Sequence, residues 1–224
     1  MDFNLSLIAE YFHKGGPFMY PILLCSIVSV TIFLYKFWTM RDKNIMPEGF
    51  LRDLYGLLVQ GRLSEAAAAC SHSESSIARI AVAALAHADH DKEELREEIE
   101  EAGKREVQEL GRYIEGLGAI SNVSTLLGLL GTISGMIKIF NVISQQTIVD
   151  PQKLAGGISE ALYTTAFGLA VAIPTYLVYK YYSEKLEEIT TSLELEGSKI
   201  ADYVLAATAP EADAPQPERE LGGR

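Results

Sequence analysis

Long apolar blocks alternate along this chain with polar stretches that carry nearly all of its charge. Three such blocks cover residues 17–38, 117–140 and 154–179. An α-helix rises about 1.5 Å per residue, so each block is long enough to cross a hydrocarbon core of roughly 30 Å. The pattern predicts an all-α integral membrane protein with three transmembrane helices.

The polar stretches next to the blocks have helical periodicity too. Residues 39–116 alternate polar and apolar positions and contain alanine-rich runs, which predicts two or three cytoplasmic helices. An apolar face runs from Val107 to Leu117 into the second block, and another follows the third block over residues 180–207. We therefore expect spans two and three to extend as long helices into the cytoplasm.

Three shorter segments complete the predicted layout. Leu5, Ile8 and Phe12 recur at helical spacing, which favours a periplasmic amphipathic helix over residues 1–16, although an ordinary solvent-flanked helix end fits the pattern as well. Residues 141–153 are predicted to form a periplasmic loop. The Pro-, Ala- and Glu-rich residues 208–224 are predicted to be a disordered tail.

The distribution of cations predicts the orientation in the membrane. Lys36, Arg41 and Lys43 close or follow the first block, whereas the loop between spans two and three carries few cations. Cytoplasmic flanks are enriched in Lys and Arg, so we expect a periplasmic N-terminus and a cytoplasmic C-terminus. Asp2 and Glu10 before the long first block argue against a cleaved signal peptide.

Composition narrows the function further. The net charge of −11 argues against a nucleic-acid partner, whose phosphates need a basic surface. The two cysteines, Cys25 and Cys70, are too isolated for a disulfide framework or a metal site, and His87 with His90 fits a solvated loop better than a metal centre. The chain also lacks a recognisable nucleophile motif or phosphate loop. We expect a protein that is not an enzyme and that binds neither cofactor nor metal.

Small and hydroxyl side chains form one stripe in span two and another in span three. The first contains Ser121, Thr125, Gly128, Thr132 and Gly135; the second contains Gly157, Ala161, Thr165, Gly168, Ala172 and Thr175. Such residues let helices approach closely in lipid, so packing alone could explain them. The glycines that we assign to packing are Gly128, Gly131, Gly135, Gly157 and Gly168.

Two further residues point to an interior that is lined with polar groups. Glu160 is the only acidic residue in the three blocks, and an intramembrane carboxylate usually faces water or protein on an ion path. The alternative is that it reaches the interface. Thr164 lies one turn further on the same face. Pro174 removes a backbone donor deep in span three and predicts a kink.

Three helices are too few to enclose a conduit, so we expect a closed homo-oligomeric ring. Neither stripe contains a second carboxylate that could carry a proton through the bilayer centre. The titrating group is therefore expected on a different protein, inserted in the ring.

Two long motifs carry a family resemblance. The sequence LLGLLGTISGMIKIF at residues 126–140 and GGISEALYTTAFGLAVAIPTYLVYKYY at residues 156–182 resemble the paired signature of the MotA/TolQ/ExbB proton channel family. GGPFMYPILLCS at residues 15–26 resembles the start of the ExbB branch. Lys180 stands where an asparagine is common, and a fourth span typical of MotA is not predicted.

The resemblance implies a bacterial inner-membrane proton channel, understood as a pentamer around an ExbD- or TolR-like single-span partner with a membrane aspartate. It also implies pore-lining roles for Thr132, Glu160 and Thr165, to which we add Thr164. An ExbB-like subunit would energise TonB-dependent transport through a TonB-like protein. The alternatives are a TolQ-like envelope function and a non-conducting membrane scaffold, and the choice between protons and sodium stays open.

Overall fold

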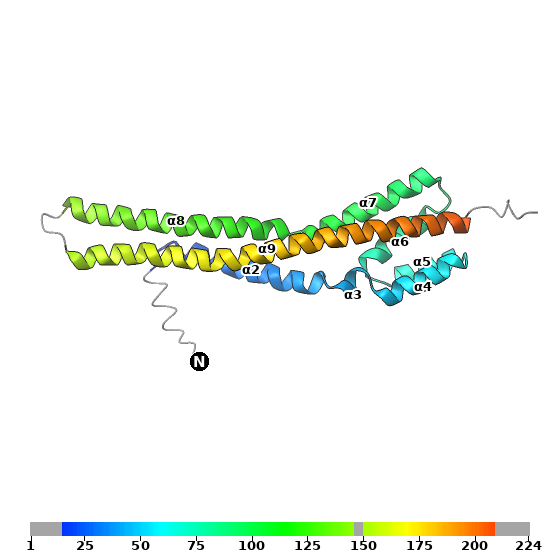
Figure 1. Ribbon diagram of the computed structural model, residues 1–224, viewed down its shortest axis with the longest axis horizontal. Coiled ribbons are helices and arrows are strands. Elements are labelled where there is room, and N and C mark those ends of the chain that lie inside the picture. The colour runs from blue at the N-terminus through cyan, green and yellow to red at the C-terminus, as the bar shows by residue number, and fades with distance from the viewer. Residues whose placement is uncertain (1–14, 146–149, 209–224) are drawn as a thin grey trace, which may run out of the picture. The chain divides into compact units, whose positions relative to one another are not determined.

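The computed structural model describes residues 15–145 and 150–208, without the side chains of Asp42 and Lys43, and every regular element in these ranges is an α-helix (Figure 1). The helices are α2 (Met19–Thr39), α3 (Asp42–Ile45), α4 (Glu48–Val59), α5 (Leu63–Ser71), α6 (Ser76–Ala86), α7 (Lys92–Gly111), α8 (Ile114–Gln145) and α9 (Pro151–Thr208). Residues 1–14 of the predicted N-terminal helix and residues 209–224 of the predicted C-terminal tail lie outside the described residues.

The helices belong to two compact units. The first, called the membrane unit below, comprises the described residues up to Arg41 together with Val107–Glu188. The second unit comprises Asp42–Glu106 and the end of α9 from Ile189 onward.

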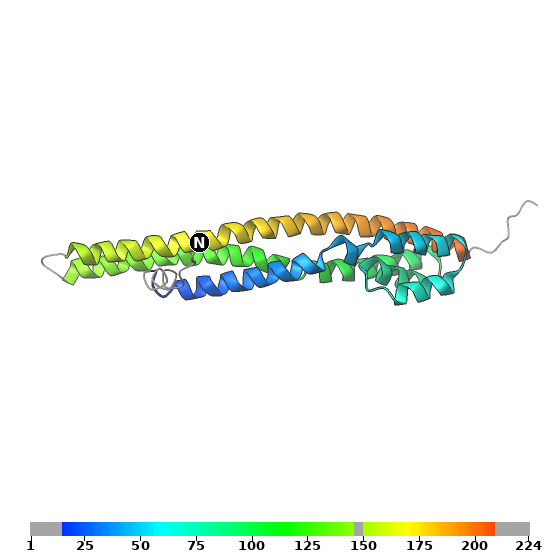
Figure 2. The same ribbon diagram turned by 90° about the horizontal axis from the view of Figure 1, so that it is seen from below.

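Three helical stretches are long and apolar enough to cross a membrane. They are Met19–Thr39, the stretch Lys92–Gln145 that includes α7 and α8, and Pro151–Thr208. Within the membrane unit, α8 and α9 lie side by side along their length and α2 lies along them (Figures 1 and 2). The predicted all-α fold with three helical spans is confirmed.

Exposed side chains on the membrane unit's helices are largely apolar. They include Leu24, Ile27 and Phe37 on α2, Leu126, Leu130 and Ile137 on α8, and Leu162, Ile173 and Leu177 on α9. So many exposed apolar side chains are costly in water and are suited to lipid or to neighbouring protein.

The long helix expected to lead into span two is interrupted between α7 and α8. Tyr113 has φ of 71°, a left-handed conformation that an α-helix cannot contain. The fully buried ammonium of Lys36 donates to the carbonyl oxygen of Leu110 at 2.6 Å, so it satisfies a carbonyl at the end of α7. The sequence pattern does not reveal this break, because only Arg112 and Tyr113 separate the two helices and the apolar face continues in register at Ile114.

The helices around the predicted loop are longer than their apolar blocks. Span two continues as helix to Gln145, and α9 begins at Pro151, so much of the segment 141–153 is helical. Asp150 accepts a hydrogen bond from the backbone N–H of Gln152 at 2.9 Å, and proline suits the first helical position. The capping residue Asp150 determines where α9 begins, whereas the predicted start of span three was based on hydrophobicity alone.

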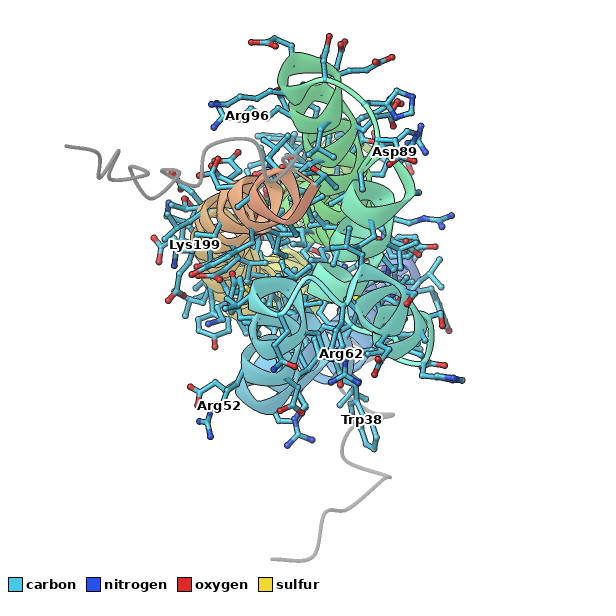
Figure 3. All side chains as sticks on the ribbon, turned by 90° about the vertical axis from the view of Figure 1, so that its right-hand side faces the viewer. Trp38, Arg52, Arg62, Asp89, Arg96 and Lys199 are labelled. Carbon is cyan, nitrogen blue, oxygen red and sulfur yellow. The ribbon has the colours of Figure 1, made fainter. Side chains whose placement is uncertain are left out.

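The second unit has its own apolar core. Its buried side chains include Leu54, Leu58, Ile77, Ile80, Leu95, Leu193 and Ile200. Arg79 donates twice to the buried carboxylate of Glu106, with both N–O distances at 2.5 Å. Figure 3 shows the charged side chains of Arg52, Arg96 and Lys199 at the outside of this unit.

A polar contact ties α4 to the last part of α9. The hydroxyl of Tyr55 donates to Glu196 at 2.5 Å, and Lys199 donates to the other oxygen of that carboxylate at 2.7 Å. Burial and the bond to Glu196 raise the pKa of the Tyr55 phenol well above its ordinary value.

Candidate functional site

The glycines of the two predicted stripes face each other within one chain. A Cβ placed on Gly168 would lie 2.7 Å from the backbone oxygen of Ser124 and 2.9 Å from Cα of Gly128. Both neighbours are backbone atoms, so side-chain rotation cannot relieve the contact. The backbones of α8 and α9 therefore touch here, and only glycine fits without moving a helix.

The close contact continues toward the loop between the two helices. A Cβ on Gly131 would lie 2.3 Å from the side chain of Thr164, and one on Gly135 would lie 2.8 Å from the Cβ of Ala161. Gly157 packs in the same way against Ile139, whose nearest atom would be 2.7 Å from an added Cβ. The glycines that we assigned to packing all lie at this contact.

Thr165 joins the two helices by a hydrogen bond. Its hydroxyl donates to the backbone oxygen of Gly128 at 2.9 Å. The bond uses the only hydrogen of the hydroxyl and leaves oxygen lone pairs that could accept a hydrogen bond from a further group.

Thr164 is fully buried and brings the N-terminal end of the described chain to α9. Its hydroxyl lies 2.5 Å from the backbone oxygen of Gly15 and 2.8 Å from that of Glu160. Both oxygens are acceptors, so the hydroxyl is engaged within its own chain.

Glu160 forms an ion pair with Lys138 of α8. The Glu160 side chain is 19% exposed and that of Lys138 is 49% exposed, so the carboxylate lies deeper than its partner. We expected Glu160 to face water or protein, but the sequence pattern did not identify Lys138 as its partner. The sequence held a signal for it, because Lys138 is the only charged residue in block 117–140, as Glu160 is in block 154–179.

Gly15 and Gly16 close the same site from the segment before α2. Gly16 has φ of +71°, and a Cβ on it would lie 2.1 Å from Oε1 of Glu160. A side chain at this position would therefore collide with the carboxylate. The sequence had singled out these glycines only as part of the motif at residues 15–26.

Thr132 does not join this group. Its hydroxyl donates to the backbone oxygen of Leu129 in its own helix at 2.6 Å. The buried face of α8 runs through Ser121, Ser124, Gly128, Gly131 and Gly135, and Thr125 and Thr132 lie beside it. Spacings of three and four residues fit both sets, so the sequence pattern alone could not separate them.

Buried hydroxyls surround the proline of span three. Ser29 of α2 and Thr175 share a hydrogen bond at 2.8 Å, and Ser121 donates to the backbone oxygen of Ala172 at 2.9 Å. Thr175 also donates to the oxygen of Val171 at 2.7 Å. Helix α9 is continuous through Pro174, which has no backbone N–H to donate. The hydroxyls of Ser121 and Thr175 donate to backbone oxygens close to it in the sequence.

Within residues 15–145 and 150–208, no three His, Cys, Asp or Glu side chains gather in a way that could hold a metal ion. The rings of His87 and His90 are tilted by 50° with their centroids 5.1 Å apart, and Nδ1 of His87 lies 2.9 Å from the backbone oxygen of Ala83. The charged side chains of blocks 117–140 and 154–179 are thus one carboxylate–ammonium pair, and a set of hydroxyls lies near them.

Comparison with known proteins identifies the family to which the chain belongs. Residues 72–195 match the model of the MotA/TolQ/ExbB proton channel family. These residues cover more than half of the chain and include both motifs. The chain belongs to this family.

Individual relatives agree with this membership. An ExbB-like biopolymer transport protein of Synechocystis sp. is 31% identical over 77% of this chain and 69% of its own length. The biopolymer transport protein ExbB of Salmonella typhimurium is 28% identical over 86% of this chain and 84% of its own length. The Tol-Pal system protein TolQ of Haemophilus influenzae is 35% identical over 39% of each chain. This chain is accordingly a membrane subunit of an ExbB/TolQ-type proton channel.

Proposed function

We propose that this chain is the ExbB-like subunit of an inner-membrane proton channel that uses the proton motive force to energise TonB-dependent transport across the outer membrane. On this proposal, the chain is a channel subunit and not an enzyme. The ExbB relative from Salmonella is similar over a much larger share of the chain than the TolQ relative from Haemophilus. The motif at residues 15–26 points to the same branch.

The observation that carries the proposal is the scarcity of titratable groups in spans two and three. Blocks 117–140 and 154–179 contain one carboxylate, Glu160, and the structure pairs it with Lys138. A carboxylate held by a cation in its own chain is poorly suited to carry protons through the bilayer. The carrier is then the membrane aspartate of an ExbD- or TolR-like partner with a single span.

A ring of identical copies would surround this partner, with a pentamer as the proposed stoichiometry. Leu126, Leu130 and Ile133 on α8 and Leu162 on α9 are exposed and are available to lipid or neighbouring copies. The distribution of cations supports a periplasmic N-terminus and a cytoplasmic C-terminus.

In the ring, Thr132 would line the conduit, because its side chain is not used in the contact between α8 and α9. Thr165 would accept a hydrogen bond from the protonated aspartate on its free lone pairs while it donates to Gly128. Protonation removes the aspartate's charge from a low-dielectric interior and so changes which ring subunit it prefers. A unit charge moved through the field gains about 2.3 kcal/mol per 100 mV, which is enough to bias such steps.

Two alternatives draw on specific observations. The TolQ relative supports a role in the Tol-Pal envelope system, with a TolR-like partner. A non-conducting scaffold is supported by the packing glycines, because the contact between α8 and α9 accounts for them without a conduit.

The experiment that separates these functions uses a strain from which the gene has been deleted. We expect the deletion to abolish TonB-dependent uptake through outer-membrane receptors while resistance to detergents persists, and we expect the wild-type gene to restore uptake. Loss of detergent resistance with normal uptake would favour the TolQ-like function. The variant Thr132→Val is expected to be made at normal levels without restoring uptake.

A further inference from the structure

Lys138, Glu160 and the Gly15–Gly16 turn come from three separate parts of the chain and meet at one place. Lys138 belongs to α8, Glu160 belongs to α9, and the glycines precede α2. Thr164, one turn after Glu160, binds the oxygen of Gly15 at 2.5 Å and so fixes the turn to α9. The carboxylate has a cation on one side and glycine backbone on another.

We propose that Lys138 and Gly16 are positioning residues for Glu160, which together form one polar site through which the chain controls proton entry to its conduit. Lys138 supplies the counter-charge, and the turn leaves room for the carboxylate only because Gly16 lacks a side chain. This inference rests on the proposed function, and it adds to that function two residues outside the pore-lining set.

Lys138 lowers the electrostatic cost of the Glu160 carboxylate. An unpaired carboxylate near the hydrocarbon region is expensive, and a nearby cation reduces that cost. Because Lys138 is the only charged residue in block 117–140, no other side chain of that block can replace it. Removal of Lys138 therefore takes away the counter-charge that holds the Glu160 carboxylate in place.

Gly16 leaves the space that the Glu160 carboxylate occupies. Its φ of +71° is strained for any residue with a Cβ, and the Cβ would overlap Oε1 of Glu160 at 2.1 Å. Gly61 offers a matched control, because it has φ of +69° but nothing within 4 Å of an added Cβ. Alanine causes the same backbone strain at both positions and disturbs Glu160 at only one.

The test measures two properties of the full-length chain, which are its thermal stability after purification and its partner-dependent proton flux in liposomes. The variants are Lys138→Gln, Glu160→Gln, the double variant and Lys138→Arg, with Lys153→Gln as control for loss of an exposed cation. We expect Lys138→Gln to reduce flux roughly fivefold or more, within the coupling that contacting residues show. Glu160→Gln should do the same, the double variant should be no worse than either, and Lys138→Arg should retain flux.

Stability tests the pair independently of conduction. We expect Lys138→Gln to lower the melting temperature more than Lys153→Gln does, and the double variant to recover part of that loss. Strictly additive changes in melting temperature would overturn the pairing. If the wild-type complex carried no current, the proposed function would fail, whereas the melting series would still decide whether Lys138 holds Glu160.

Gly16→Ala is compared with Gly61→Ala in the same two assays. We expect Gly16→Ala to lose flux as Glu160→Gln does, and Gly61→Ala to keep wild-type flux. Wild-type flux in Gly16→Ala or in Lys138→Gln would overturn the proposal that these residues position Glu160.

Discussion

The variant Gly168→Ala tests the contact between α8 and α9 most sharply. The added Cβ would lie 2.7 Å from the oxygen of Ser124 and 2.9 Å from Cα of Gly128, whereas ordinary contact begins at 3.4 Å. Since both neighbours are backbone, the helices must separate by several tenths of an ångström.

The cost has two parts. Extra atoms forced into a well-packed contact cost about 1–3 kcal/mol. Separation also lengthens the bond from Thr165 to Gly128, which is 2.9 Å in the structure, and such bonds between membrane helices contribute about 0.6 kcal/mol on average. We expect a loss of about 2 kcal/mol, which corresponds to roughly thirtyfold in the unfolding equilibrium.

The assay is reversible unfolding of the purified chain in mixed micelles, followed by circular dichroism. Gly156→Ala serves as control, because it lies in the same helix and nothing lies within 4 Å of an added Cβ. Alanine favours a helix interior over glycine by about 0.5–1 kcal/mol, so the control should be as stable as the wild type or slightly more stable. Equal stabilities of the two variants would refute the argument that α8 and α9 meet at their backbones.

Three further predictions concern single side chains. Thr165→Val should lose partner-dependent proton flux and Thr165→Ser should keep most of it, because serine retains the hydroxyl that binds Gly128; equal flux in both would remove the hydroxyl from the mechanism. Arg79→Met should destabilise the chain by about 1–3 kcal/mol in thermal unfolding, because the buried Glu106 loses its two charged donors, and an unchanged melting temperature would contradict this. Cys70 is buried, and burial raises the pKa of its thiol to about 11, so mass spectrometry should find iodoacetamide labelling at pH 8 slow in the folded chain and fast after unfolding. Because the folded-state pKa is above the unfolded value, the stability due to this burial is complete below about pH 8.5 and is lost as the pH rises toward 11.

Hydrophobic length was enough to predict the three spans, because a membrane helix must satisfy its backbone internally and present apolar side chains to lipid. The same criterion could not place the ends of the helices. Asp150 and Pro151 start α9, and the left-handed Tyr113 breaks the helix before span two. Both depend on local backbone chemistry that an average over many residues hides.

The candidate site could be predicted only in part. Glu160 stood out because it is an acid in an apolar block, and Thr164 followed from its spacing. The role of Lys138 as its partner and the approach of Gly16 depend on how three distant segments pack, which periodicity within one helix does not contain. Likewise, spacing could not show that Thr165 of α9 faces α8, whereas Thr132 of α8 lies beside the face that α8 packs against α9.

The central claim is that this chain conducts protons only together with a partner that carries the titrating aspartate. The most direct measurement is proton flux into liposomes under an imposed potential, with the chain alone, with its single-span partner, and with Glu160→Ala or Thr165→Val in the assembled complex. The account predicts flux that needs the partner and falls in both variants. A fully assembled wild-type complex that carried no proton current would contradict it and would favour the scaffold.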